Sequence, residues 1–227
     1  MNIMLLSKSK PNFFAKTSVD LCQSLAKKSE FALLVNPLSM AQAIQKFLGW
    51  TGRVCRNAKS RGYAITHYNL GVRAETSRYL KQRWYSEVSY RLPRESDGRV
   101  VFSFGANDSG WAGKQQGIEL SESIANARSI LTQAKQLYPI LMVSPPPCGD
   151  VAQEKRNQIL ANLSQEFALV CNELDVPYLD VFSSLVKSPI WLAEAKANDG
   201  AHPKADGYAE FAAIVQNWEG WLNWFTP

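Results

Sequence analysis

The sequence has little histidine and no clustered cysteine. His67 and His202 are the two histidines among 227 residues. The four cysteines are Cys22, Cys55, Cys148 and Cys171. They form no Cys-x-x-Cys pair and no ligand pattern with a histidine, whereas a structural zinc site needs closely spaced thiolates and imidazoles. The sequence therefore predicts no structural metal. The scattered cysteines favour buried thiols in a reducing compartment, and we expect a cytoplasmic protein.

Long apolar runs and blocks of one charge are also missing. The N-terminal stretch "MNIMLLSKSKPNFFAKTS" holds only a short apolar patch with little positive charge before it, which suits neither a secretory core nor a membrane span. The formal net charge is +5, but Lys and Arg are scattered among Asp and Glu. No nucleic-acid motif accompanies them. We therefore expect no membrane span and no nucleic-acid partner, and no pattern indicates an oligomeric state.

Short apolar runs alternate with amphipathic stretches along the chain. The runs that predict strands cover residues 31–35, 63–71, 98–108, 139–147 and 176–182. The stretches that predict helices cover residues 41–62, 75–90, 121–137, 153–174 and 205–225. Strands that alternate with helices indicate parallel pairing and a sheet covered on both faces. The length and the 46% hydrophobic content fit one α/β domain.

Polar groups follow the predicted strands, where ligands bind in open α/β sheets. Gly71 ends one strand, Asn107 follows another, and Asp199 and His202 lie in a loop before the last helix. Ester hydrolysis needs a nucleophile, an imidazole base, a group that orients the imidazole and donors for the oxyanion. These residues supply three of the four roles. Asn107 also suits a turn, and Gly71 also suits a strand end.

Three motifs carry these residues in a fixed order. They are "YNLG" with Asn69 and Gly71, "GAND" with Gly105, Asn107 and Asp108, and "DGAHP" with Asp199, His202 and Pro203. Together they resemble the conserved blocks of the SGNH (GDSL) hydrolases, a family of esterases, lipases, thioesterases and carbohydrate deacetylases. The resemblance covers residues 49–227. It leaves residues 1–30 unmatched, and we expect those to be a poorly ordered extension before an SGNH-like domain at residues 31–227.

The resemblance implies a fold and a mechanism. The fold is a three-layer α/β/α sandwich with a flavodoxin-like parallel sheet. His202 is the base, Asp199 orients it, and Gly71 and Asn107 line the oxyanion hole. The implied reaction is hydrolysis of a small-molecule carboxylic ester through an acyl-enzyme, without a metal or organic cofactor. The acyl and alcohol groups are not implied.

The nucleophile block of that family, Gly-Asp-Ser after the first strand, is absent from this sequence. The equivalent place reads "NPLSM". Ser39 is the candidate nucleophile because it is the one serine between "FALLV" and "FLGW". It stands one residue later than an alignment on "LLV" predicts. Pro37 supplies neither an N–H group nor the backbone freedom of glycine.

Two other interpretations stay open. One is a catalytically impaired SGNH-like protein that binds a ligand without turnover, and the other is an unrelated flavodoxin-like binding module. A one-base insertion or deletion in the gene would explain why the family pattern resumes only at "FLGW". Codons for "MAQAIQK" can be chosen that read Gly-Thr-Gly-Asp-Ser-Lys in a shifted frame, which resembles the continuation after the family's nucleophile.

Overall fold

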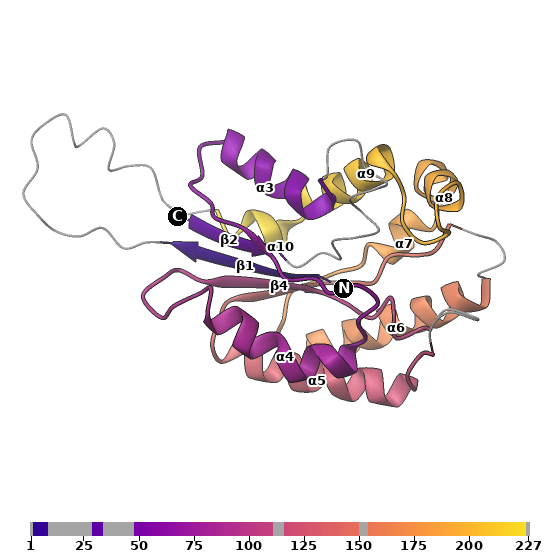
Figure 1. The fold of residues 1–227 in the computed structure, drawn as a ribbon, viewed down its shortest axis with the longest axis horizontal. Coiled ribbons are helices and arrows are strands. Elements are labelled where there is room, and N and C mark those ends of the chain that lie inside the picture. Colours follow the sequence, from indigo (N-terminus) through magenta and orange to yellow (C-terminus); the bar gives the residue numbers. More distant parts are fainter. Residues whose placement is uncertain (1, 9–28, 34–47, 111–115, 150–153, 226–227) are drawn as a thin grey trace, which may run out of the picture.

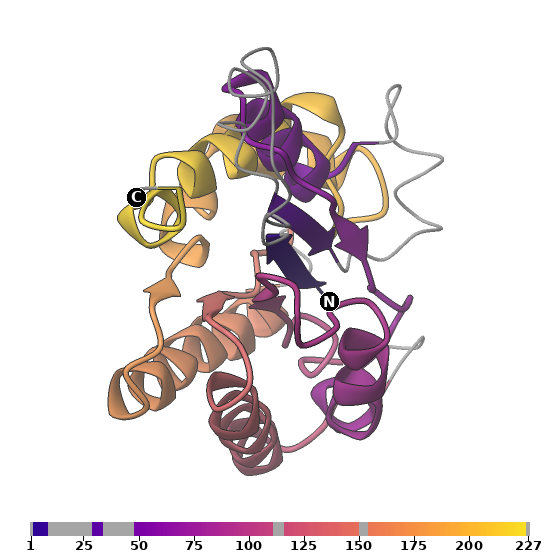
Figure 2. The same ribbon diagram turned by 90° about the vertical axis from the view of Figure 1, so that its left-hand side faces the viewer.

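A six-stranded sheet lies between two layers of helices in the computed structural model (Figures 1 and 2). The structure describes residues 2–8, 29–33, 48–110, 116–149 and 154–225. The strands are β1 (Asn2–Lys8), β2 (Ser29–Leu33), β3 (Tyr68–Asn69), β4 (Arg99–Ser103), β5 (Ile140–Val143) and β6 (Tyr178–Leu179). This arrangement confirms the predicted α/β class and its three layers.

Helices α4 (Ser77–Ser89), α5 (Leu120–Lys135) and α6 (Glu154–Glu173) cover one face of the sheet. Helices α3 (Trp50–Ser60), α9 (Ala205–Gln216) and α10 (Glu219–Leu222) cover the other face. The shorter α7 (Phe182–Leu185) and α8 (Pro189–Lys196) precede α9. Within the described part of the chain, no helix is both long enough and apolar enough to cross a bilayer.

All described strands except β1 run in the same direction. The order is β2-β1-β4-β5-β6, and β3 also pairs with β1. The pairs β4–β5 and β5–β6 are parallel, while β1 is antiparallel to β2, β3 and β4. Strands β2 to β6 therefore end at one edge of the sheet, as the predicted parallel sheet requires. We call this the carboxyl edge.

The antiparallel β1 was not anticipated, because its short apolar patch stands in the predicted extension. It supplies a strand to the sheet, pairing Asn2 with Ser103 and Leu6 with Phe31. Residues 9–28 lie outside the described residues, so the domain boundary at residue 30 stays a prediction.

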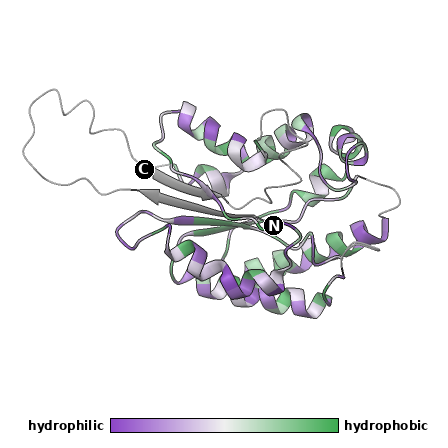
Figure 3. Cartoon of the chain, viewed as in Figure 1, coloured by the Kyte–Doolittle hydropathy of each residue, from purple (hydrophilic) through white to green (hydrophobic). Residues whose placement is uncertain are grey.

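Side chains of β4 and β5 alternate between two apolar cores. Val100 and Phe102 pack with α4, α5 and α6, whereas Val101 packs with α3 and α9. Apolar surfaces of the helices face the sheet from both sides (Figure 3). Burying one such side chain contributes about 1.5–3 kcal/mol to folding. The alternation explains why both faces of these strands are apolar in sequence.

The helix ends refine two sequence-based expectations. Helix α3 stops before Gly62, which has a φ of 91°, in agreement with the predicted glycine stop. The helix predicted for residues 205–225 is instead two helices, because the backbone of Trp218 turns to an extended conformation with a ψ of 130°. Helix α8 was not predicted; Ser188 caps it by accepting a hydrogen bond from the N–H of Trp191.

Candidate active site

Asp199 and His202 form a hydrogen-bonded pair in the loop between α8 and α9. The distance from His202 Nδ1 to Asp199 Oδ2 is 2.7 Å. The other carboxylate oxygen, Oδ1, accepts from the N–H of His202 at 2.8 Å and from the N–H of Ala201 at 3.0 Å. Because an ionised carboxylate can only accept, Nδ1 carries a proton, and in the neutral imidazole the lone pair is on Nε2. The pair therefore presents a base.

Asp199 stays ionised although it is half-buried. Burial acts to raise the pKa of its carboxyl, but the hydrogen bond and the charge of His202, with the N–H groups of Ala201 and His202, hold the pKa well below its ordinary value. A permanently charged partner fixes the imidazole tautomer and stabilises the imidazolium that forms when the base takes a proton.

Neighbouring elements hold this loop in place. Gly200 has a φ of 90°, which glycine adopts without strain, and its carbonyl accepts from the N–H of Gly149 at 2.9 Å. Glu194 of α8 accepts from the N–H groups of Lys204 at 2.9 Å and Gly207 at 2.7 Å, and so caps the start of α9. The loop is thus attached to the end of β5 and to both flanking helices.

Asn107 follows β4 at the carboxyl edge. Gly105 has a φ of 103°, and a Cβ atom there would lie 2.8 Å from the Phe167 ring, so the "GAND" turn requires its glycine. The side-chain Nδ2 of Asn107 donates to the carbonyl oxygen of Glu75 at 3.0 Å. An amide nitrogen carries a second hydrogen, which this contact does not use. That hydrogen can serve an oxyanion.

Gly71 lies on the loop that contains Glu75, the hydrogen-bond partner of Asn107, but its N–H already makes a hydrogen bond. It donates to Asn69 Oδ1 at 3.1 Å, the local turn that asparagine commonly makes. The Glu75 carbonyl joins this loop to Asn107. The two expected oxyanion donors therefore lie on loops that a hydrogen bond connects. To bind an oxyanion, the Gly71 N–H would have to share its hydrogen bond with Asn69 or give it up.

Arg83 and Glu75 support the Gly71 loop, and the sequence-based analysis missed both. Arg83 of α4 makes two hydrogen bonds to the Glu75 carboxylate, each 2.5 Å long, and a third to the carbonyl of Leu70 at 2.9 Å. Glu75 is buried. A carboxylate at the first position of the predicted helix 75–90 was the available signal, but its partner could not be chosen from the sequence.

Asp108 joins the loop after β4 to α4. Its side chain is buried, and Oδ1 accepts from the N–H of Ser77 at 2.7 Å at the start of α4. Burial raises the pKa of Asp108, although hydrogen bonds from Ser77 and Ser123 oppose that shift. The carboxylate satisfies one of the open N–H groups of the helix. This residue of the "GAND" motif therefore positions the loop beside Asn107.

The predicted nucleophile, Ser39, lies outside the described residues, and the described chain resumes at Leu48. The second histidine, His67, was not a predicted site residue; it is exposed and directly precedes β3. Among the residues described, no group of three or more His, Cys, Asp or Glu side chains could hold a metal ion.

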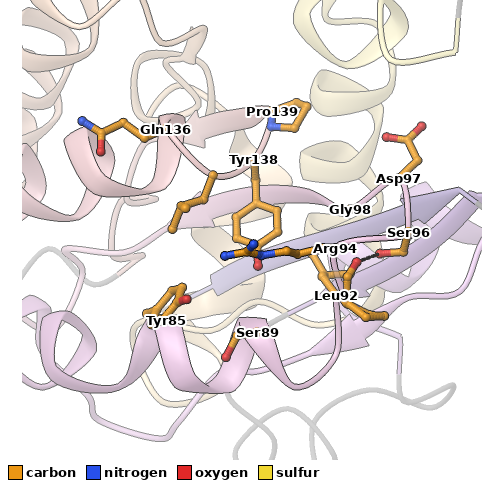
Figure 4. Close-up of a pocket in the computed structure, with 12 residues that line it drawn as sticks. Tyr85, Ser89, Leu92, Arg94, Ser96, Asp97, Gly98, Gln136, Tyr138 and Pro139 are labelled. Atoms are coloured by element: carbon orange, nitrogen blue, oxygen red, sulfur yellow. Dashed lines mark hydrogen bonds between the residues drawn. The ribbon is translucent and has the colours of Figure 1, made fainter.

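A hollow of about 710 Å³ lies at the opposite edge of the sheet (Figure 4). It is bordered by Gly98 and Pro139, which precede β4 and β5, and the side chains of Tyr85, Arg94 and Tyr138 surround it. None of the predicted site residues lines it. The acid–base groups are therefore assembled away from this hollow.

Comparisons with known proteins bear on the family and the fold of the chain. Residues 39–210 match the GDSL-like Lipase/Acylhydrolase family. Similar solved structures include a catalytic mutant of Axe2, an acetylxylan esterase from Geobacillus stearothermophilus, with 21% identity, a TM-score of 0.64, and coverage of 76% of this chain and 83% of that chain. Another is the acetyl xylan esterase AlAXEase, with 14% identity, a TM-score of 0.58, and coverage of 73% and 88%. No curated protein sequence matches at a significant level. The family match spans most of the chain, and the chain belongs to the GDSL-like lipase/acylhydrolase family of ester hydrolases.

Proposed function

We propose that the protein is a serine esterase that cleaves small carboxylic esters through an acyl-enzyme. The observation that carries this proposal is the 2.7 Å contact between Asp199 and His202, which in the neutral imidazole places the lone pair on Nε2. Such a base can activate a serine hydroxyl. The likeness to acetylxylan esterases makes an acetyl ester the first substrate to test.

The proposed reaction has two halves. His202 Nε2 takes the proton of the Ser39 hydroxyl as the oxygen attacks the ester carbonyl, and the developing oxyanion is bound by the Gly71 N–H, Asn107 Nδ2 and the N–H of the nucleophile. The imidazolium then protonates the leaving alcohol. Water, deprotonated by the same imidazole, hydrolyses the acyl-enzyme and regenerates the serine.

The second candidate function is ligand binding without turnover, and the sequence "NPLSM" favours it because the nucleophile block is missing. The nucleotide sequence that encodes the segment from "LVNP", at the end of the first predicted strand, to "MAQAIQK" tests the hypothesis of a one-base insertion or deletion. A shifted frame that encodes Gly-x-Ser followed by Gly-x-Gly would support a lost nucleophile block, and the absence of such a frame would remove that explanation.

A fluorophosphonate ester probe tests the nucleophile directly. We expect the wild-type protein to be labelled on Ser39, as located by peptide mapping, because His202 activates the hydroxyl. His202→Ala is expected to lose the label while remaining folded by circular dichroism. Label on another serine would replace Ser39 in the mechanism. Absence of label in the wild-type protein would favour the non-catalytic alternative.

Asn107→Ala tests the oxyanion hole. We expect kcat for an acetyl ester to fall by roughly 10²–10³-fold, the usual loss for one oxyanion donor. KM should change far less, because the donor acts mainly on charge that develops in the transition state. Urea unfolding checks that the loop survives without the bond to the Glu75 carbonyl. An unchanged kcat would exclude Asn107 from the mechanism.

A further inference from the structure

Arg156 is a buried cation on the inner face of α6. It is 7% exposed and shares the buried stripe of the helix with Leu160, Leu163 and Phe167. An arginine at such a position must have its N–H groups satisfied by the protein, because burying an unpaired charge is costly.

Two of its hydrogen bonds hold the loop that carries Asn107. Nη2 donates to the carbonyl of Ala106 at 2.9 Å, and Nε donates to Ser109 Oγ at 2.8 Å. The Ser109 hydroxyl in turn donates to the Ala106 carbonyl at 2.7 Å. Asn107 lies between the two contacted residues, so the planar guanidinium fixes the backbone on both sides of it.

A third bond reaches the loop that follows β5. Nη1 of Arg156 lies 3.1 Å from the Cys148 Sγ atom. The neighbouring Asn157 holds the backbone of Cys148 at both its N–H, at 2.7 Å, and its carbonyl, at 3.0 Å. The next residue, Gly149, donates to the Gly200 carbonyl beside Asp199. One end of α6 thus connects the Asn107 loop to the Asp199–His202 loop.

The positive charge of Arg156 also acts on that loop. Burial lowers the pKa of Arg156, while Cys148 and the Asp199 carboxylate raise it. A guanidinium remains protonated under these conditions. The charge therefore strengthens the hydrogen bonds with which Arg156 holds the loops after β4 and β5.

We propose that Arg156 is a positioning residue that sets the orientation of the Asn107 side chain relative to the Asp199–His202 loop. The inference rests on the proposed esterase function of the same site. It assigns to α6 a role in oxyanion binding that acts through the backbone on both sides of Asn107.

Nuclear magnetic resonance of the Asn107 side-chain amide is the first test, with Asn107→Ala to assign its signals. In Arg156→Gln we expect these signals to shift or broaden, because the guanidinium bonds to Ala106 and Ser109 on both sides of Asn107 are lost. Arg128→Gln, which removes an exposed arginine paired with Glu173, should leave them unchanged. Unchanged Asn107 signals in Arg156→Gln overturn the proposal.

Arg156→Lys tests the effect on catalysis, and it keeps the proposal testable if the Gln variant does not fold. Lysine retains the charge but not the planar fork, so kcat should fall while KM changes little. A wild-type kcat in this variant overturns the positioning role. If the wild-type protein has no turnover, the esterase proposal fails, but the side-chain amide signals of Asn107 still test Arg156.

Discussion

Asp199→Asn is expected to lower kcat for ester hydrolysis by roughly 10⁴-fold, the loss typical of this exchange in a serine–histidine–aspartate site. The asparagine oxygen can still accept from the N–H groups of Ala201 and His202, so the loop should keep its shape. Its amide nitrogen, however, can donate to Nδ1 of His202. The imidazole proton then moves to Nε2, where the lone pair of the base is needed.

The matched control is Asp206→Asn, which removes an exposed carboxylate from the first turn of α9 without touching the imidazole. Its kcat should stay close to the wild-type value. Nitrogen chemical shifts of His202 report the tautomer even in a protein without turnover. A kcat within about tenfold of the wild type in Asp199→Asn, against the four decades expected, would mean that Asp199 does not orient the base.

Arg83→Leu is expected to lower the free energy of unfolding by about 3–5 kcal/mol, the range for removing one partner of a buried ion pair. Glu75 has a side chain that is 4% exposed, and without Arg83 its charge would be left uncompensated. The carbonyl of Leu70 would also lose a donor directly before Gly71. Urea unfolding measures the change.

Helix α4 offers a matched control for this prediction. Arg78 makes two hydrogen bonds to the Glu122 carboxylate, but the Arg78 side chain is 51% exposed and that of Glu122 is 35% exposed. Arg78→Leu should leave the free energy of unfolding near the wild-type value, because solvent screens exposed pairs. The double variant Arg83→Leu with Glu75→Leu should recover much of the loss. If Arg78→Leu and Arg83→Leu lowered the free energy of unfolding equally, burial of the ion pair would not determine the size of the loss.

The parts of the site that depend on short-range contacts could be predicted from the sequence. Asp199 and His202 are three residues apart in "DGAHP", and the resemblance of this motif to the family block implied that Asp199 orients the imidazole; the two side chains are 2.7 Å apart. The "GAND" turn was predicted because Gly105 and Asn107 are typical turn residues after an apolar strand. The assignment of Ser39 as nucleophile stays a prediction, as do the catalytic roles of the other residues.

Contacts between distant segments could not be predicted in the same way. Arg156 and Ala106 are 50 residues apart, and their contact depends on which loops the sheet order brings together. A signal existed, since Arg156 occupies a position in the apolar stripe of α6 where a leucine would be expected. The antiparallel placement of β1 could not be predicted either, because a four-residue apolar patch does not specify strand direction.

Most of the attachments of the catalytic loop come from nearby residues. The bonds to Asp199, to Gly200 and to the first N–H groups of α9 come from residues 149–207, and Arg53 of α3 adds a bond to the carbonyl of Ala205 at 3.1 Å. Strand β2 ends at the carboxyl edge, where these loops lie. Replacing the segment that follows β2 would therefore remove none of these bonds, and a grafted Gly-Asp-Ser there would leave the sheet at the same edge as the base.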